Sequence, residues 1–223
     1  MTTISRYNLL CLLTLLPLIV ACSNPTTSPS PESTPTTAPT TTPLIDDFDP
    51  PNPAWARFDT VESAVYAQDG ELYLEDRGKG IAVYTPLAGK IYTDTIVTVQ
   101  VRHVQGTVNN WMGVICRQQD KDTYYLLAIS ADGFYLILLV EDGTATPLAG
   151  PKTSEIIHTG KARNDLEVRC VDDALSLWVN NKRLVTHTDD TLREAGAVAL
   201  FADAVERGET SVTAFDNFSL TRP

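Results

Sequence analysis

The stretch TYYLLAISADGFYLILLVEDG, residues 123–143, decides the fold. Two runs rich in Tyr, Leu, Ile and Val flank Asp132-Gly133, and Asp142-Gly143 ends the second run. An Asp-Gly pair between apolar runs favours a tight hairpin turn, because both residues tolerate the backbone conformation that such a turn requires. We therefore predict two adjacent antiparallel strands, followed by a second turn.

The same pattern continues through the rest of residues 44–223. Further hairpins are predicted in SAVYAQDGELYLED (63–76), around Asp69-Gly70, and in ALSLWVNNKRLVTHT (174–188), around Asn180-Asn181. Other strand-like runs are KGIAVYTP (79–86), DTIVTVQVRHV (94–104), NNWMGVICRQ (109–118), NDLEVRCVDD (164–173), GAVALFAD (196–203) and SVTAFDNFSLT (211–221). This part of the chain shows no convincing helical period; TLREAG (191–196) could form one turn at most. Roughly twelve short strands and little helix predict an all-β antiparallel sandwich or barrel.

The first 21 residues read as an export signal. Arg6 precedes an apolar run from Leu9 to Val20, which as a helix would rise only about 18 Å against roughly 30 Å of bilayer hydrocarbon. LIVAC, residues 18–22, resembles the lipobox of bacterial lipoproteins. The resemblance implies cleavage before Cys22 and acyl chains on it, a stable anchor. The alternative is an ordinary secretory signal in which Cys22 is incidental.

A linker follows the cysteine. Residues 23–43 contain eight Thr, four Ser and six Pro, so 18 of 21 positions hold residue types that build no core. The prolines favour extended polyproline II, and at ~3.1 Å per residue the segment reaches up to about 65 Å. We expect residues 22–43 to form a tether, with or without O-glycans. Residues 44–223 are enough for one domain with a core.

Charge narrows the choice of partners. The formal net charge is −11 and becomes −12 when Arg6 is removed with the signal. Such an acidic chain lacks the basic patch that nucleic acid requires, and anionic membrane surfaces would repel it. Neutral glycans, cations or proteins fit better.

Two cysteines remain in the domain. Cys116 and Cys170 each lie in an apolar strand-like run. An exported domain is exposed to oxidising conditions, so the pair predicts one disulfide; two buried free thiols are the alternative. No C-x-x-C spacing occurs, so neither a zinc site nor a redox motif is indicated.

The order of several motifs resembles a known superfamily. These motifs are LIDDFD (44–49), GVICRQQDKDTYYLLAISADGFYLI (113–137), LEVRCVDDALSLWVNNKRL (166–184), GAVALFA (196–202) and AFDNFSL (214–220). Together they are similar to bacterial exported domains of the concanavalin A-like lectin/glucanase superfamily, closest to the group related to 3-keto-disaccharide hydrolases. The resemblance implies a jelly-roll sandwich of two curved antiparallel sheets, with adjacent first and last strands and ligands on the concave face. It does not fix a function, because this fold hosts many.

No catalytic constellation is evident. Glucanases of this superfamily carry E-x-D-x-E or E-x-D-x-x-E on one strand, which places two carboxylates ~5 Å apart, and this chain has neither pattern. The pairs Asp46-Asp47, Asp172-Asp173 and Asp189-Asp190 are expected in solvated turns or at strand ends. The histidines, namely His103, His158 and His187, are expected on surface strands or loops, and only Glu141 stays open as a lone acid. We predict no catalytic residues of a conventional glycosidase.

Binding is easier to support than catalysis. Strand alternation places Met112, Val114 and Cys116 on one face and Trp111, Ile115 and Arg117 on the other. Aromatic rings can stack on sugar rings while a guanidinium reaches the hydroxyls. We therefore predict ligand-binding roles for Trp111, Arg117, Tyr125, Tyr135 and Trp178. The alternative for each is a packing role.

A calcium site is a further possibility. Asp47 and Asp216 would meet if the first and last strands pair, and Ca²⁺ binds carboxylate and carbonyl oxygens. The alternative is that Asp216-Asn217 caps a turn or faces water. No other cofactor is expected.

Three functions remain open. The first is a non-catalytic, monomeric lipoprotein on the outer face of a bacterial membrane, at the cell surface or in the periplasm, that binds carbohydrate or another envelope polymer. The second is a glycoside hydrolase or lyase of the 3-keto-disaccharide type. The third is a protein-interaction or structural module.

Overall fold

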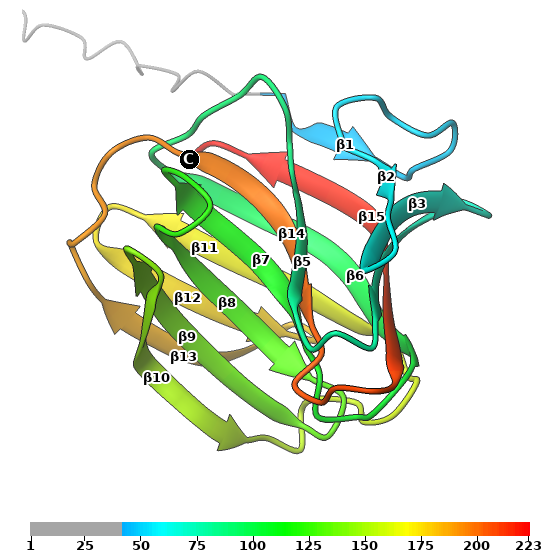
Figure 1. Cartoon of the computed structure of the whole chain (residues 1–223). Helices are drawn as coiled ribbons and strands as arrows, with labels where there is room; N and C mark the ends of the chain where they lie inside the picture. The colour runs from blue at the N-terminus through cyan, green and yellow to red at the C-terminus, as the bar shows by residue number, and fades with distance from the viewer. Residues whose placement is uncertain (1–41) are drawn as a thin grey trace, which may run out of the picture. The chain divides into compact units, whose positions relative to one another are not determined.

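A computed structural model describes residues 42–223 (Figure 1). The predicted signal peptide, Cys22 and nearly all of the linker lie outside the described residues. Every regular element of residues 42–223 is a β-strand, which confirms the all-β prediction. The described region accordingly holds no helix with the length and hydrophobicity to cross a bilayer.

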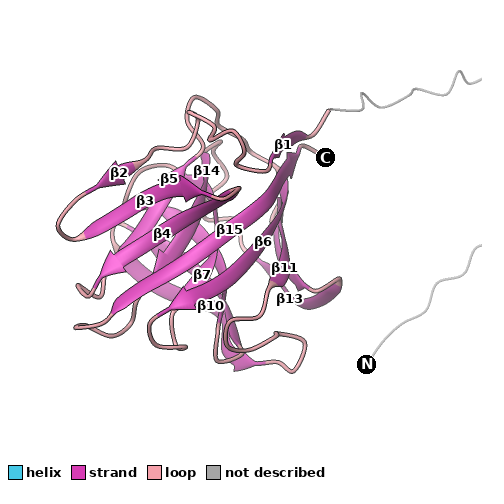
Figure 2. Ribbon diagram, turned by 90° about the vertical axis from the view of Figure 1, so that its right-hand side faces the viewer, coloured by secondary structure: helices cyan, strands magenta, loops and turns pink. Residues whose placement is uncertain are grey.

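The strands form two antiparallel sheets. The nine-stranded sheet runs in the order β13 (Lys182–Thr188), β12 (Ala174–Val179), β11 (Asn164–Val171), β6 (Thr95–Gln105), β15 (Thr210–Thr221), β4 (Glu71–Arg77), β3 (Ser63–Gln68) and β2 (Phe58–Asp59), with β1 (Leu44–Asp46) also on β15. The six-stranded sheet runs in the order β10 (Thr144–Thr153), β9 (Phe134–Glu141), β8 (Tyr124–Ser130), β7 (Trp111–Gln118), β14 (Ala197–Asp203) and β5 (Ala82–Pro86). Figure 2 shows β4, β15 and β6 side by side. The pairing of β1 with β15 confirms that the first and last strands are adjacent.

The predicted turns form where the sequence places them. At Asp69-Gly70, Asp142-Gly143 and Asn180-Asn181 both residues have positive φ, between 49° and 77°. A two-residue turn with both φ positive matches the twist of the strands that it joins, which is why Asn, Asp and Gly occur there. The hairpins therefore follow directly from local sequence.

Strand β10 was not anticipated, and neither was the two-residue strand β2. β10 contains Pro147 and Pro151, which argue against a strand because proline donates no ladder hydrogen bond. It forms nonetheless, because it lies at the sheet edge and pairs with β9 on one side only, through two register shifts. The prolines are tolerated at this edge.

The core lies between the sheets. Alternate residues of β6, namely Val97, Val99 and Val101, face inward and are at most 2% exposed. Cys116 of β7 and Cys170 of β11 form a disulfide that joins the sheets, confirming the predicted pair. The described residues thus form one sandwich with a covalent link through its core.

Removing the disulfide tests its contribution to stability. Replacing both Cys116 and Cys170 with Ala should lower the free energy of unfolding by about 2–4 kcal/mol, because the link closes a long loop in the unfolded chain. Urea unfolding of the oxidised protein and the double variant measures the difference. Equal unfolding midpoints would show that the link contributes nothing.

Candidate ligand-binding faces

The outer face of the six-stranded sheet carries an unusual apolar cluster. Its side chains come from five strands of this sheet: Ile115 and Trp111 of β7, Tyr124, Leu126 and Ala128 of β8, Leu136, Leu138 and Val140 of β9, Ala199 and Phe201 of β14, and Tyr84 of β5. Most are at most 8% exposed, although they point away from the main core. The outward side chains of neighbouring strands thus bury one another on this face. We call it the concave face, after the side on which the jelly-roll resemblance places ligands.

Polar and aromatic groups surround this apolar floor. Trp111 and Tyr84 are half-buried, so part of each ring reaches solvent. Asp203, at the end of β14, lies directly opposite Trp111 in the ladder. Burial raises the pKa of the Asp203 carboxyl, and the charge of Asp76 raises it further. The face thus combines aromatic surfaces with one half-buried acid.

The loop between β7 and β8 adds charge to the rim. Burial raises the pKa of the Tyr84 hydroxyl, Asp122 raises it further and Lys121 opposes this effect. Burial likewise raises the pKa of Tyr124, with smaller contributions from Tyr84 and Asp203. Both phenols therefore stay protonated near neutral pH and can donate hydrogen bonds to a ligand.

The outer face of the nine-stranded sheet holds a separate groove. Its volume is 360 Å³, and its lining includes Thr98, Gln100, Asp165, Glu167, Arg169, Trp178, Asn181 and Asn217. Trp178 of β12 is the only aromatic residue of the lining. The guanidinium groups of Arg169 and Arg183 lie 5.1 and 5.7 Å from the centre of its ring.

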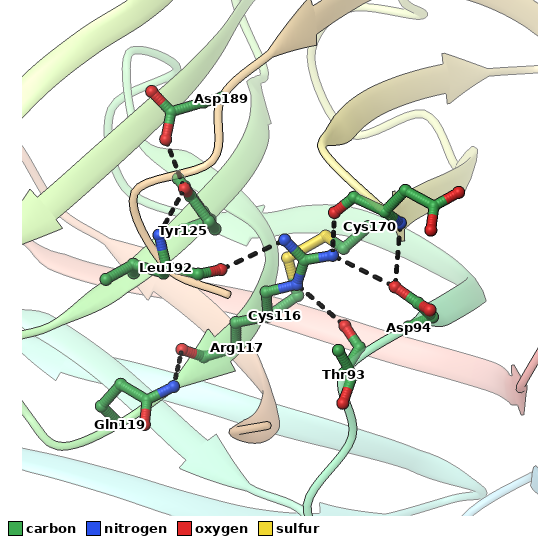
Figure 3. Close-up of a disulfide and its surroundings, with 10 residues drawn as sticks. Thr93, Asp94, Cys116, Arg117, Gln119, Tyr125, Cys170, Asp189 and Leu192 are labelled. Atoms are coloured by element: carbon green, nitrogen blue, oxygen red, sulfur yellow. Dashed lines mark hydrogen bonds and ion pairs between the residues drawn. A yellow bond between two sulfur atoms is a disulfide. The ribbon is translucent and has the colours of Figure 1, made fainter. Parts of the chain in front are cut away.

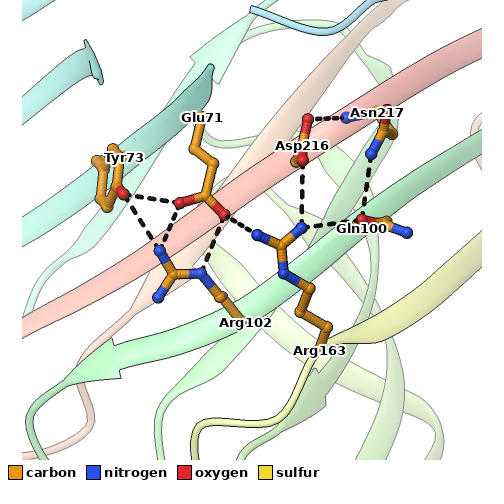
Figure 4. A network of polar contacts seen from close by, with 7 residues as sticks. All are labelled: Glu71, Tyr73, Gln100, Arg102, Arg163, Asp216 and Asn217. Atoms are coloured by element: carbon orange, nitrogen blue, oxygen red, sulfur yellow. Dashed lines mark hydrogen bonds and ion pairs between the residues drawn. The ribbon is translucent and has the colours of Figure 1, made fainter. Parts of the chain in front are cut away.

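A network of ionic contacts adjoins this groove (Figure 4). The Glu71 carboxylate accepts hydrogen bonds from Arg102, at 3.0 Å from Nε, and from Arg163, at 2.9 Å. The hydrogen bond from Arg102 is the largest of the effects that lower the pKa of Glu71. Arg163 also contacts Asp216 at 3.2 Å and Gln100 at 3.1 Å. Gln100 therefore belongs to both the network and the groove lining. The hydrogen bond from Arg163 holds its side-chain oxygen in place.

The structure separates the five predicted ligand residues. Trp111 lies on the outer face of the six-stranded sheet and Trp178 on the outer face of the nine-stranded sheet. Tyr135, near the start of β9, packs against the core between the sheets. Trp111 and Trp178 therefore cannot serve one continuous site.

The alternation predicted that Arg117 shares the outer face with Trp111, but the side chain is buried. Figure 3 shows its guanidinium group among Thr93, Asp94 and Leu192. Its φ of +50° and the register shift opposite it, between β7 and β14, mark a bulge that breaks the alternation. The side chain is 1% exposed and donates to the carbonyls of Thr93 at 2.8 Å and Leu192 at 3.1 Å, and to the carboxylate of Asp94 at 3.2 Å. Arg117 thus connects the loops that contain Thr93 and Leu192 to β7, next to the disulfide.

Tyr125 also faces inward. Its ring is fully buried, and its hydroxyl donates to Asp189 and accepts the N–H of Leu192 at 2.9 Å (Figure 3). Burial, with a further contribution from Asp189, raises the pKa of Tyr125 to about 12. The geometry gives Tyr125 a packing role.

His103 corrects another expectation. It was predicted on a surface strand or loop, but it is 2% exposed and its Nε2 lies 3.1 Å from the carbonyl of Gly106. It faces inward because side chains alternate along β6, and His103 follows Val101 by two residues on the face that packs in the core. Burial lowers the pKa of this imidazole. His158 is exposed and His187 half-buried.

The arrangement of acidic side chains does not support the predicted calcium site. Within residues 42–223 no group of three or more His, Cys, Asp or Glu side chains is placed to hold a metal ion. Asp216 contacts Arg163, while Asp47 accepts the N–H of Asp49 at 3.2 Å. Asp46, rather than Asp47, turns inward and accepts the indole N–H of Trp55 at 2.8 Å. Calcium binding stays a prediction for solution experiments.

Asp203 is the residue that sequence reasoning missed. The alternation Ala199, Phe201, Asp203 in GAVALFAD places one acid in line with two apolar residues, which is the only local signal. Its position opposite Trp111 depends on the pairing of β14 with β7, strands that are distant in sequence. Local pattern alone does not reveal that pairing.

Comparison with known proteins agrees on the fold. No protein-family model and no curated protein matches the chain. A carbohydrate-binding module, CBM66, from Bacillus subtilis superposes with a TM-score of 0.60 at 15% identity, covering 75% of this chain and 94% of the module. A β-1,3-1,4-glucanase (lichenase) from a mouse hindgut metagenome superposes with a TM-score of 0.61 at 8% identity, covering 82% of this chain and all of the enzyme. Residues 42–223 therefore share the lectin/glucanase-like jelly-roll fold.

The shifted pKa of Asp203 predicts a stability effect. A carboxyl whose pKa is raised in the folded state stabilises the fold below its ordinary pKa, and this contribution is lost as the pH rises through the raised value. Asp203→Asn should therefore raise the unfolding temperature at pH 7 by a few degrees, with the gain vanishing below about pH 4.

Glu71→Gln is the control of opposite sign. Its lowered pKa means that the ionised carboxylate stabilises the fold above the ordinary pKa of Glu, so this variant should be less stable at pH 7. Calorimetric scans between pH 3 and pH 8 measure both variants. An Asp203→Asn protein that is less stable than the original at pH 7 would contradict the assignment.

Proposed function

We propose that this protein is a surface-anchored, non-catalytic module that binds carbohydrate on the concave face of its six-stranded sheet. The observation that carries the proposal is the apolar floor flanked by the exposed edges of Trp111 and Tyr84, with Asp203 opposite Trp111. Apolar C–H surfaces of sugar rings stack on aromatic side chains, while carboxylates and phenols bind sugar hydroxyls. The fold shared with a carbohydrate-binding module and a glucanase supports the same class of ligand.

The half-buried acid adds to this argument. A carboxylate that burial holds at a raised pKa costs stability at neutral pH. Such groups cluster at functional sites, where they contact ligand or take part in chemistry. Asp203 therefore fits a hydrogen-bonding role toward a sugar hydroxyl beside Trp111.

Binding is favoured over hydrolysis because, within residues 42–223, the carboxylate whose charge acts on Asp203 is already engaged in a turn. Conventional glycosidases use two carboxylates on either side of the scissile bond. The acid whose charge acts on Asp203 is Asp76, which is 3% exposed and accepts the N–H groups of Lys79 at 3.0 Å and Gly80 at 2.8 Å. Its oxygens are engaged in a turn. A hydrolase of the 3-keto-disaccharide type is the alternative, which turnover of a 3-keto-glycoside by the purified protein would establish.

The proposal includes the predicted anchor. Acyl chains on Cys22 would hold the module at a membrane, and residues 23–43 would set its distance from the lipid. To bind an envelope or extracellular polymer, the module must extend some distance from the membrane, which the linker would allow. The high negative charge keeps the module away from anionic lipid surfaces.

Glycan binding tests the function. The exported chain carrying Cys22→Ser, which is expected to be recovered in solution, would be titrated with a broad saccharide panel with and without a calcium chelator. Trp111→Ala should weaken the affinity for the bound saccharide about tenfold or more, equivalent to about 1.4 kcal/mol. Loss of binding on chelation would in addition establish the calcium site.

Tyr66→Ala is the matched control, because Tyr66 is a half-buried aromatic residue that stacks on Tyr73 on the other sheet. It should leave the affinity unchanged. Absence of binding to every saccharide by the folded chain would overturn the proposed function. Equal losses in the two variants would place the site elsewhere.

The anchor has its own test. In a bacterial host the original chain should fractionate with membranes, and its N-terminal peptide should begin at Cys22 and carry acyl mass. Cys22→Ser should appear in the soluble fraction without that mass. An original chain that is cleaved but unacylated would favour the ordinary secretory signal.

A further inference from the structure

The groove around Trp178 has the features of a second binding site. It lies on the outer face of the nine-stranded sheet, whereas Trp111 lies on the outer face of the six-stranded sheet. Its volume of 360 Å³ falls within the range of small-molecule pockets, about 300–1,000 Å³. The proposed function does not use this groove.

The Trp178 indole supplies the main evidence for a ligand. Its Nε1 is buried, yet no acceptor for its N–H lies among the described residues. A buried donor without an acceptor costs the fold its lost hydration, about 1–3 kcal/mol. The N–H is covered by other side chains, so a ligand oxygen in the groove would satisfy it once those side chains move aside; the indole is an unused donor beside the groove.

The ring of Trp178 is held in place. Arg169 and Arg183 lie over it at 5.1 and 5.7 Å, and Arg169 is fixed in turn by an ion pair with Glu167 at 2.5 Å. Cation–π contacts of this kind stabilise the ring orientation. Binding therefore requires little ordering of the aromatic group, which lowers its entropic cost.

The amides of the groove are also positioned in advance. The Gln100 oxygen accepts hydrogen bonds from Arg163 at 3.1 Å and from Asn217 at 3.1 Å (Figure 4). With its oxygen occupied, the amide N–H₂ of Gln100 remains as a donor, and the oxygen of Asn217 as an acceptor. Mixed donors and acceptors around one aromatic ring suit hydroxyl groups, which both donate and accept.

Charge indicates a neutral ligand. Asp165 and Glu167 supply two negative charges to the lining, while Arg169 in the lining and Arg183 over the Trp178 ring supply two positive charges, so the groove carries no net charge. An anionic ligand would be repelled by Asp165, for which the described residues provide no ion-pair partner. Neutral polyhydroxylated molecules satisfy the groups present without an uncompensated charge.

We infer that the Trp178 groove binds a neutral saccharide unit and that the module carries two saccharide sites on opposite faces. The Trp178 site stands on its own observations, while the count of two rests on the proposed function. Two opposed sites let one anchored module bridge two chains or branches of a polymer. Such bridging raises the overall affinity by multivalency.

Binding stoichiometry tests the inference. The exported Cys22→Ser chain would be titrated by calorimetry with neutral hexasaccharides of glucose, xylose and mannose, in the original form and as Trp111→Ala, Trp178→Ala and the double variant. We expect two sites in the original, one in each single variant and none in the double variant. Trp178→Phe keeps one aromatic ring beside the two arginines but removes the N–H together with the five-membered ring, and it should weaken the second site about tenfold.

The possible failures are distinguishable. One site that is lost in Trp111→Ala and unaffected by Trp178→Ala or Trp178→Phe would overturn the second site and leave the proposed function intact. One site that is lost in Trp178→Ala alone would support the groove and overturn binding at Trp111. No binding to any hexasaccharide by a chain with an intact disulfide and a cooperative unfolding transition would overturn both.

Discussion

The burial of alternate residues between two antiparallel sheets is the constraint on which the rest of this structure depends. Because side chains alternate across a strand, placing Val97, Val99 and Val101 inside fixes the residues between them outside. The same rule puts Trp111 and Trp178 on opposite outer faces. The Cys116–Cys170 link joins the two layers through the core. The candidate binding faces are therefore consequences of the core.

The two outer faces differ in kind. The concave face of the six-stranded sheet is apolar, and its side chains bury one another. Polar groups such as Asp203 lie at its rim. The outer face of the nine-stranded sheet carries charged pairs, amides and the groove at Trp178. This difference favours ring stacking on one side and a denser set of hydrogen bonds on the other. Both kinds of contact serve saccharides.

Local sequence predicted most of the strands and turns, because each depends on residues close together in the chain, and it predicted the disulfide from the expected export of the domain. It did not predict where Arg117 points, since a bulge turns that side chain inward. Nor did it place Asp203 opposite Trp111, because that contact follows from the order of strands in the sheet. The alternation of side chains along a strand is broken at bulges. It also does not predict which strands distant in sequence pair with each other.

The indole N–H signals of the three tryptophans test the central claim most directly. In a ¹⁵N-labelled chain, Trp55 serves as an internal reference because its indole is buried and bonded to Asp46. With increasing saccharide, the Trp111 signal should shift in a saturable way while that of Trp55 stays in place. A saccharide that binds without moving the Trp111 signal would contradict the assignment of the concave face as the binding site.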